Sequence, residues 1–159
     1  MSGVLKIRSV KVCWRIDEDP DLSFLGKFTD VESEHAIERF PDGGGDLRVC
    51  RYFVPGLTAE ESGDPGSPRR DCERMEAFVR GDWCMVGVWA QAEVVTPSGV
   101  SHTVRSGGLW GIESDSGDGY YEETAREQLE DLCAELGYFG IAEDESRAAL
   151  ADVALFPGE

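Results

Sequence analysis

The clearest strand signal in the chain is the run Trp83-Cys84-Met85-Val86-Gly87-Val88-Trp89-Ala90-Gln91-Ala92-Glu93-Val94-Val95. Every even-numbered position in this run is apolar, and a period of two is typical of a strand that buries one face. Trp83, Met85 and Trp89 lie on the other face, so we expect the first half of the strand to be covered on both sides. The run therefore predicts the best-defined strand of the chain.

Further strands lie on either side of this run. Residues 97–99 predict a hairpin turn, after which Val100–Ile112 returns as the partner strand. Residues 4–16 predict a long strand whose alternation slips at Ser9, as a β-bulge would cause. Leu47–Val54 predicts another strand, which ends where a proline follows.

Two helices are indicated as well. Residues 67–80 predict a helix with Ser67 as its N-cap, Gly81 as its stop and an apolar face made up of Cys72, Met75, Phe78 and Val79. Residues 118–137 predict a longer amphipathic helix. Its apolar face consists of Tyr121, Ala125, Leu129, Leu132 and Leu136.

The remaining segments are less regular. Residues 22–40 predict a loop with a short helix near Glu32–Phe40, residues 41–46 a cluster of turns, and residues 56–68 a polar connector. A short last helix is expected over Glu143–Val153. Together these elements predict an α+β fold in one domain that takes in all 159 residues. We expect an antiparallel sheet of about four strands with two to three helices packed on it.

Charge is the dominant feature of the composition. The formal net charge is −17, and residues 113–159 alone contain 14 acidic and 2 basic side chains. Such a field repels nucleic acid and anionic membranes and attracts basic surfaces. We therefore expect a protein partner with a basic groove, no direct binding of nucleic acid and no membrane contact.

Several other features bear on location and redox state. No apolar run approaches 18 residues, and the N-terminus lacks the apolar region of a secretory signal. The five cysteines are odd in number and widely spaced, so we expect free, buried thiols in a reducing compartment. These observations predict a cytoplasmic protein.

Two short motifs are similar to ligand-binding loops. Ser106–Gly111 has the glycines of a phosphate loop, but it lacks the lysine and is followed by acidic residues, so we predict a kinked strand and turn. The turn Glu113–Gly119 is similar to a calcium loop, yet Ala125 stands where the bidentate glutamate is needed. We predict that Asp118 instead caps the following helix, with a weak cation site as the alternative.

The chain offers few residues suited to catalysis. It has two histidines, His35 and His102, and no surrounding sequence that would activate a thiolate. Carboxylate pairs are uninformative among 32 acidic residues, although a small carboxylate- or cation-dependent hydrolase stays an alternative. We expect no enzymatic activity, no catalytic residues, no metal and no cofactor.

Aromatic residues supply a second candidate surface. All four tryptophans (Trp14, Trp83, Trp89 and Trp110) lie in predicted strands, where core packing is the first expectation. An exposed patch that binds a protein is the alternative, because tryptophan is enriched at interface hot spots. Its anchors would be Trp110 together with Tyr120 or Tyr121.

The acidic arc of the long helix is the strongest candidate for a binding site. It carries Glu122, Glu123, Glu127, Glu130, Asp131 and Glu135 around a single arginine, and Glu113, Asp115 and Asp118 precede it. A dense anionic ridge on a rigid helix can occupy a groove built for the phosphates of nucleic acid. A solvated helix face is the competing interpretation.

Parts of the chain resemble a group of uncharacterised proteins carried by bacterial viruses and plasmids. The similar segments are Arg80–Gly87, Ala90–Val94 and above all Ser106–Ser116, with a weaker echo at Arg51–Pro55. The resemblance covers roughly residues 70–137 and transfers no catalytic residue. It implies an accessory protein of a mobile element that binds and inhibits a defence complex in the bacterial host cell, as an anti-CRISPR or anti-restriction protein that mimics DNA.

Overall fold

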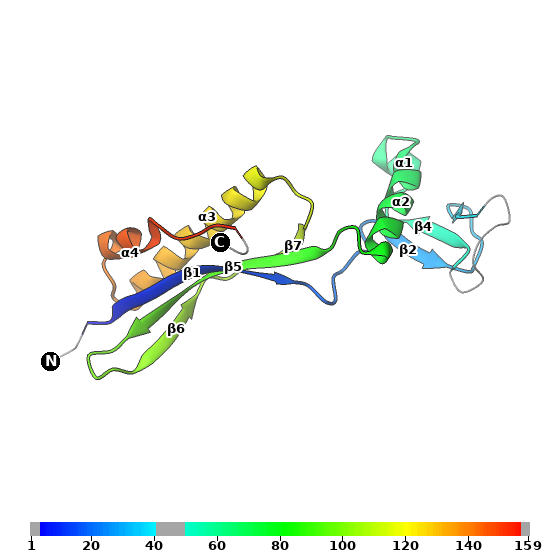
Figure 1. The fold of residues 1–159 in the computed structure, drawn as a ribbon. Helices are drawn as coiled ribbons and strands as arrows, with labels where there is room; N and C mark the ends of the chain where they lie inside the picture. The colour runs from blue at the N-terminus through cyan, green and yellow to red at the C-terminus, as the bar shows by residue number, and fades with distance from the viewer. Residues whose placement is uncertain (1–3, 41–49, 157–159) are drawn as a thin grey trace. The chain divides into compact units, whose positions relative to one another are not determined.

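The computed structural model describes residues 4–40 and 50–156. Its residues divide into two compact units, the first formed by the chain up to Glu18 together with Cys84 onwards, the second by Asp19–Trp83 (Figure 1). The predicted α+β class is confirmed, since helices pack on an antiparallel sheet of four strands and a second, smaller sheet is present. The single domain stays a prediction, because this division does not decide whether the units fold separately.

The sheet of the first unit is built around β5 (Met85–Val95). β1 (Lys6–Ile16) pairs antiparallel along one edge of β5, and the predicted β-bulge is confirmed by a register shift between Ile7 and Ser9. β6 (Ser101–Arg105) and β7 (Leu109–Glu113) both pair with the other edge of β5. The returning strand is therefore divided in two at the predicted kink.

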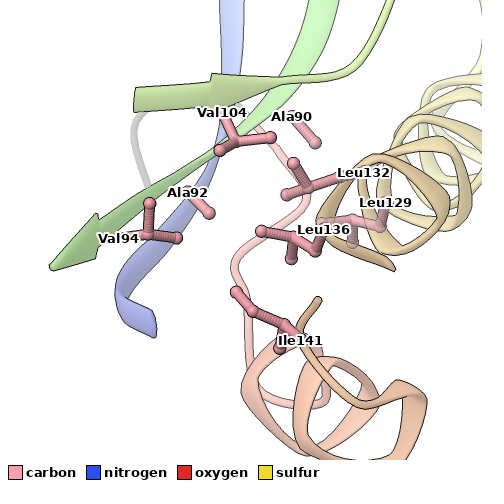
Figure 2. Packing of buried hydrophobic residues seen from close by; sticks show 8 residues of the cluster. All are labelled: Ala90, Ala92, Val94, Val104, Leu129, Leu132, Leu136 and Ile141. Carbon is pink, nitrogen blue, oxygen red and sulfur yellow. The ribbon is translucent and has the colours of Figure 1, made fainter. Parts of the chain in front are cut away.

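Two helices cover one face of this sheet. α3 (Asp118–Tyr138) matches the predicted long helix to within one residue, and α4 (Glu143–Leu150) ends three residues before the predicted boundary. Figure 2 shows the core between sheet and helices, in which leucines of α3 meet small residues of β5. Its buried members are Ala90, Ala92, Val94, Val104, Leu129, Leu132, Leu136 and Ile141. Each fully buried leucine contributes roughly 1.5–3 kcal/mol by removal from water.

The second unit has its own small core. β4 (Tyr52–Pro55) is the centre of a sheet with β2 (Gly26–Thr29) and β3 (Ile37–Glu38) on either side. α1 (Ala59–Ser62) and α2 (Ser67–Arg80) follow in the chain. The buried hydrophobic residues of this unit are Leu25, Phe53, Cys72, Met75 and Trp83. As predicted, α2 ends at Gly81, which adopts the left-handed conformation.

The structure corrects three predictions for this unit. The short helix near Glu32–Phe40 is wrong, because Ile37 pairs with Phe53 in a β-ladder and this pairing overrides the local preference. The polar connector contains α1, which begins with a capping box between Thr58 and Glu61. Pro55 belongs to β4 instead of following it. The predicted turns at 41–46 and the first residues of the predicted strand 47–54 lie outside the described residues.

Two details of α2 also differ from expectation. Gly66 is its N-cap residue in place of Ser67, and no side chain caps the helix. Val79 is 67% exposed although it was assigned to the buried face. Cys72 and Met75 are buried as predicted, so the apolar stripe is narrower than the pattern indicated.

Candidate binding surfaces

The outer face of α3 and α4 collects most of the acidic side chains of the first unit. The heptad-like spacing of the buried leucines leaves the intervening carboxylates on the solvent side. Glu123, Glu127, Glu130 and Asp131 are exposed, and Glu122 and Glu135 are half-buried. A shallow open depression in this face is lined by Gly119, Glu122, Glu123, Arg126, Glu127 and Glu130.

Ion pairs neutralise one flank of this face. Arg126 donates to Glu122 at 2.9 Å, one helical turn earlier, and Arg147 of α4 donates to Glu130 at 2.9 Å and to Glu143 at 2.9 Å. The hydrogen bond from Arg147 holds the pKa of Glu130 below its usual value. These pairs are exposed, so each contributes at most about 1 kcal/mol to stability. Their main effect is to reduce the negative potential on the flank next to α4.

The other flank keeps its charge. Glu123, Glu127, Asp131 and Glu135, which we call the acidic row, follow one another at intervals of four residues along α3. Within the described part of the chain, none of the four has a basic partner. Residues four apart rise by about 6 Å and lie on one side of a helix. The acidic row is therefore the strongest anionic feature of the unit.

The residues of the turn before α3 have different roles from those expected. Glu113 is the last residue of β7 and pairs with Met85, so it belongs to the sheet and not to the helix face. The predicted cap at Asp118 is wrong, because Gly117 is the N-cap and no side chain caps the helix. Asp118 still places its charge at the positive end of α3, and Asp115 lies in the turn. Nowhere in residues 4–40 and 50–156 do three or more ligating side chains form a group that could hold a metal.

The predicted aromatic anchors lie in different layers. Trp110 of β7 is 49% exposed and stacks on Trp89, with ring centroids 6.2 Å apart and an interplanar angle of 28°. Tyr120 is 47% exposed on the first turn of α3. Tyr121 is half-buried, with its ring 5.1 Å from that of Trp14, and burial raises its pKa. The structure therefore separates the anchors that the sequence grouped together.

The four tryptophans, which we expected to pack in the core, differ in how deeply they are buried. Trp83 is 3% exposed and lies just before β5, outside any strand. Trp14 is half-buried and donates from its indole nitrogen to the Leu155 carbonyl at 3.0 Å. Trp89 is half-buried as well. Trp110 is the most exposed of the four.

The glycine-rich motif has a structural role that matches the predicted kink. Gln128 of α3 is buried, and its side-chain oxygen accepts from the Ser106 hydroxyl at 2.6 Å and from the Gly108 backbone N–H at 3.0 Å. Ser106 in turn accepts from the Ala90 N–H at 2.9 Å. These hydrogen bonds connect the bend between β6 and β7 to α3 and to β5. They therefore fix the orientation of β7 relative to β6.

The five cysteines are free thiols. Cys72 and Cys133 are buried, and Cys13, Cys50 and Cys84 are half-buried. Burial, with a further contribution from the hydrogen bond to Glu76, raises the pKa of Cys72 to about 12. Its thiol therefore stays protonated at neutral pH. His35 and His102 are both exposed and belong to different units.

The sequence interpretation missed a second charged surface, on the sheet. We call the face of the sheet that turns away from α3 the open sheet face. Apart from Arg126 and Arg147, every basic side chain of the first unit comes from β1 or β6: Lys6, Arg8, Lys11, Arg15 and Arg105. The signal was present, because Lys11, Cys13 and Arg15 alternate with the apolar residues of β1. A net charge of −17 for the whole chain gives no indication of this local cluster of bases.

Comparison with known proteins adds no relative: no family model matches the chain, and neither a curated protein nor a solved structure is similar to it. Among the described helices, none combines the length and the apolar character that crossing a membrane requires.

Proposed function

We propose that this protein acts by binding, and that the acidic row of α3 is the surface with which it occupies the basic groove of a nucleic-acid-binding protein. A row of carboxylates on a rigid helix presents negative charge at regular intervals, as a nucleic-acid backbone does. The acidic row would compete with nucleic acid for the basic groove of the partner, so we expect it to inhibit nucleic-acid binding by that partner.

The observation that carries the proposal is the cost of the acidic row to its own helix. Like charges four residues apart destabilise a helix by about 0.2–0.5 kcal/mol per pair. The acidic row contains three such pairs without a compensating base in the described residues, whereas Glu122 and Glu130 are each paired with an arginine. A surface that only had to be solvated could have used the paired arrangement throughout. A binding role accounts for the unpaired row.

The class of partner rests on the resemblance to proteins of bacterial mobile elements. Small acidic proteins of that kind commonly block host defence complexes. We therefore propose a restriction enzyme or a CRISPR effector of the host cell as the target. A groove of this kind is lined by Lys and Arg, so the association should be fast and should weaken as salt screens the charges.

The test begins with affinity capture. The tagged protein is expressed in bacteria that carry active restriction and CRISPR systems, nucleic acid is digested, and bound proteins are identified by mass spectrometry. We expect a defence nuclease or guide complex that is released between about 0.15 and 0.5 M salt, a range over which the Debye length falls from about 8 Å to about 4 Å. Purified target should then lose its nucleic acid when the protein is added.

A matched pair of triple variants assigns the contact. Glu123→Gln, Glu127→Gln and Asp131→Asn together neutralise most of the acidic row without disturbing Glu122 or Glu130. The control, Glu32→Gln, Glu34→Gln and Glu73→Gln, removes the same charge from exposed positions of the second unit. We expect the first variant to lose capture and inhibition and the control to keep both. Equal behaviour of the two variants, or capture of a partner without a nucleic-acid groove, would contradict the proposal.

A further inference from the structure

The open sheet face carries an aromatic platform. A Cβ built on Gly87 would lie 2.3–2.6 Å from three carbons of the Trp110 indole, so the ring rests directly over this glycine of β5. One side of the indole is covered by the strand, yet Trp110 remains 49% exposed. The exposed area therefore belongs to the parts of the ring that neither Gly87 nor Trp89 covers. Trp89 is the stacking neighbour of this ring, with centroids 6.2 Å apart.

Basic side chains surround this platform on the same face. Arg15 pairs with Gly87 in the register of β1 and β5, which places it next to the Trp110 ring. Lys11 and Arg105 flank Gln91 from either side, and the Arg105 guanidinium lies 4.5 Å from the centre of the Trp89 ring. Lys11, Arg15 and Arg105 are exposed. Strands are about 4.8 Å apart and residues rise by about 3.3 Å along a strand, so the backbone positions of the three bases lie within about 16 Å of one another.

The acidic side chains of this face are few and partly occupied. Glu93 accepts from Arg8 at 3.4 Å and from the Ser101 hydroxyl at 2.8 Å. Glu113 is paired with Met85 on this face, and Asp17, whose N–H donates to the Met85 carbonyl at 2.9 Å, follows Arg15 by two residues at the end of β1. The acidic row lies on the far side of α3, beyond a helix diameter of about 10 Å. Because the interaction between charges falls with distance, the nearer side chains of the sheet contribute more to the potential at the platform than the acidic row does.

We propose that the open sheet face binds single-stranded nucleic acid, with a base stacked on the exposed part of the Trp110 ring and phosphates held by Lys11, Arg15 and Arg105. An aromatic surface among basic residues is the chemistry that recognises unpaired bases, whereas the bases of a duplex are stacked on each other and cannot reach the ring. The proposal reverses the expectation drawn from net charge alone. It is independent of the proposed role of the acidic row.

Fluorescence anisotropy with labelled 12-mers of dT and of rU, and with a 12-bp duplex, tests the proposal on the full chain. We expect both single strands to bind more tightly than the duplex. Whether the dT or the rU strand binds more tightly then indicates whether the natural ligand is DNA or RNA. With three phosphate contacts, the logarithm of the affinity should fall with the logarithm of salt concentration with a slope of about −2. Tryptophan fluorescence should be quenched as the strand binds.

Variants locate the site. Trp110→Ala should weaken binding by about 5- to 150-fold, the equivalent of ~1–3 kcal/mol for one base stacked on an aromatic ring. Because Trp110 also packs on Gly87, the double variant Lys11→Gln and Arg15→Gln gives a second test that leaves the packing intact. It should weaken binding and flatten the salt slope to about −0.7. Lys27→Gln with Arg69→Gln removes the same charge from exposed positions of the second unit and should have no effect.

Three results would overturn the proposal. One is the absence of any oligonucleotide binding by the wild-type chain at low salt. Another is an equal loss of binding in the control double variant, which would mean that charge acts without a site. The third is tighter binding of a labelled poly-glutamate peptide than of either oligonucleotide with no effect of Trp110→Ala, which would assign the face to an acidic protein or to the acidic row of a second copy.

Discussion

The two faces of the first unit are built from one core but carry opposite charge. The helix layer carries the unpaired carboxylates of the acidic row, and the sheet layer carries five of the seven basic side chains of the unit together with two stacked tryptophans. Both patterns arise from periodicity, since a period near 3.6 sorts the residues of α3 and a period of two sorts those of β1. The net charge of −17 therefore describes neither face.

The two proposals also complement each other. A complex of protein and nucleic acid offers both a basic groove and a strand with unpaired bases, and the two faces of the unit match these two features. Each face can be tested without the other, because the variants for one leave the residues of the other unchanged. Single substitutions in the shared core, in the bend of the sheet and on the helix face separate what each part contributes to stability and binding.

The largest effect is expected from the core that joins the faces. Leu132 is fully buried between α3 and β5. Leu132→Ala removes this packing and leaves a cavity, so we expect the free energy of unfolding to fall by about 2–5 kcal/mol. Urea denaturation followed by circular dichroism measures the change, and binding by both faces should decline together as the unit unfolds.

Val79→Ala is the matched control, because Val79 is 67% exposed on α2. Its free energy of unfolding should stay within about 0.5 kcal/mol of wild type. A loss below 1 kcal/mol for Leu132→Ala would mean that the helix layer does not depend on the sheet for its stability, and the common core would be refuted.

The sheet around β5 was predictable from the sequence because strong local signals coincide there. The apolar alternation, the turn at 97–99 and the phase slip at Ser9 each identify one feature, and all three are present in the structure. α3 was equally clear, because its apolar residues recur at helical spacing over five turns. For β5 and α3, the predicted interior side is the buried one.

Predictions failed where tertiary contacts decide the conformation. The two-residue strand at Ile37 exists because Phe53 pairs with it, and no local pattern could indicate a partner that far along the chain. The role of Gln128 could not be read either, since a glutamine in a helix is ordinary until the strand bend that it binds is in place. The acidic arc was predictable as a helix face, but its division into a paired flank and an unpaired row depends on Arg147 from α4.

A smaller effect is expected from the network that sets the direction of β7. Gln128→Met keeps the volume of the side chain and removes the acceptor of Ser106 and Gly108. The buried Ser106 hydroxyl and the half-buried Gly108 N–H would lose their acceptor, and we expect a loss of about 1–3 kcal/mol. The bend positions Trp110. In this variant the affinity for oligonucleotides should therefore fall by a larger factor than the affinity of the acidic row for its protein partner.

The control for this variant is an exposed side-chain hydrogen bond in the same sheet. Ser98→Ala removes the contact between the hydroxyls of Thr96 and Ser98 in the hairpin turn. We expect a change within about 0.5 kcal/mol, as is usual for surface substitutions. If Gln128→Met were as mild as Ser98→Ala, the network would not be what holds the bend.

The smallest effect concerns the contrast within the helix layer. The pKa of Glu130 is lowered in the folded protein by the hydrogen bond from Arg147. The pair therefore stabilises the fold at pH values above the ordinary pKa of a glutamate, 4.5, and this contribution is lost as pH falls through the lowered folded value. Glu130→Gln should cost less than about 1 kcal/mol at pH 7 and nothing at pH 2, measured by urea denaturation at both values.

Glu127→Gln gives the opposite sign and completes the comparison. Glu127 has carboxylate neighbours four residues away on both sides, Glu123 and Asp131, so neutralising it at pH 7 relieves repulsion. We expect a gain of about 0.4–1 kcal/mol at pH 7 for the two pairs, measured by urea denaturation. A destabilising Glu127→Gln at pH 7 would show that the acidic row is stabilised by contacts of its own, and the argument that it exists for a partner would fail.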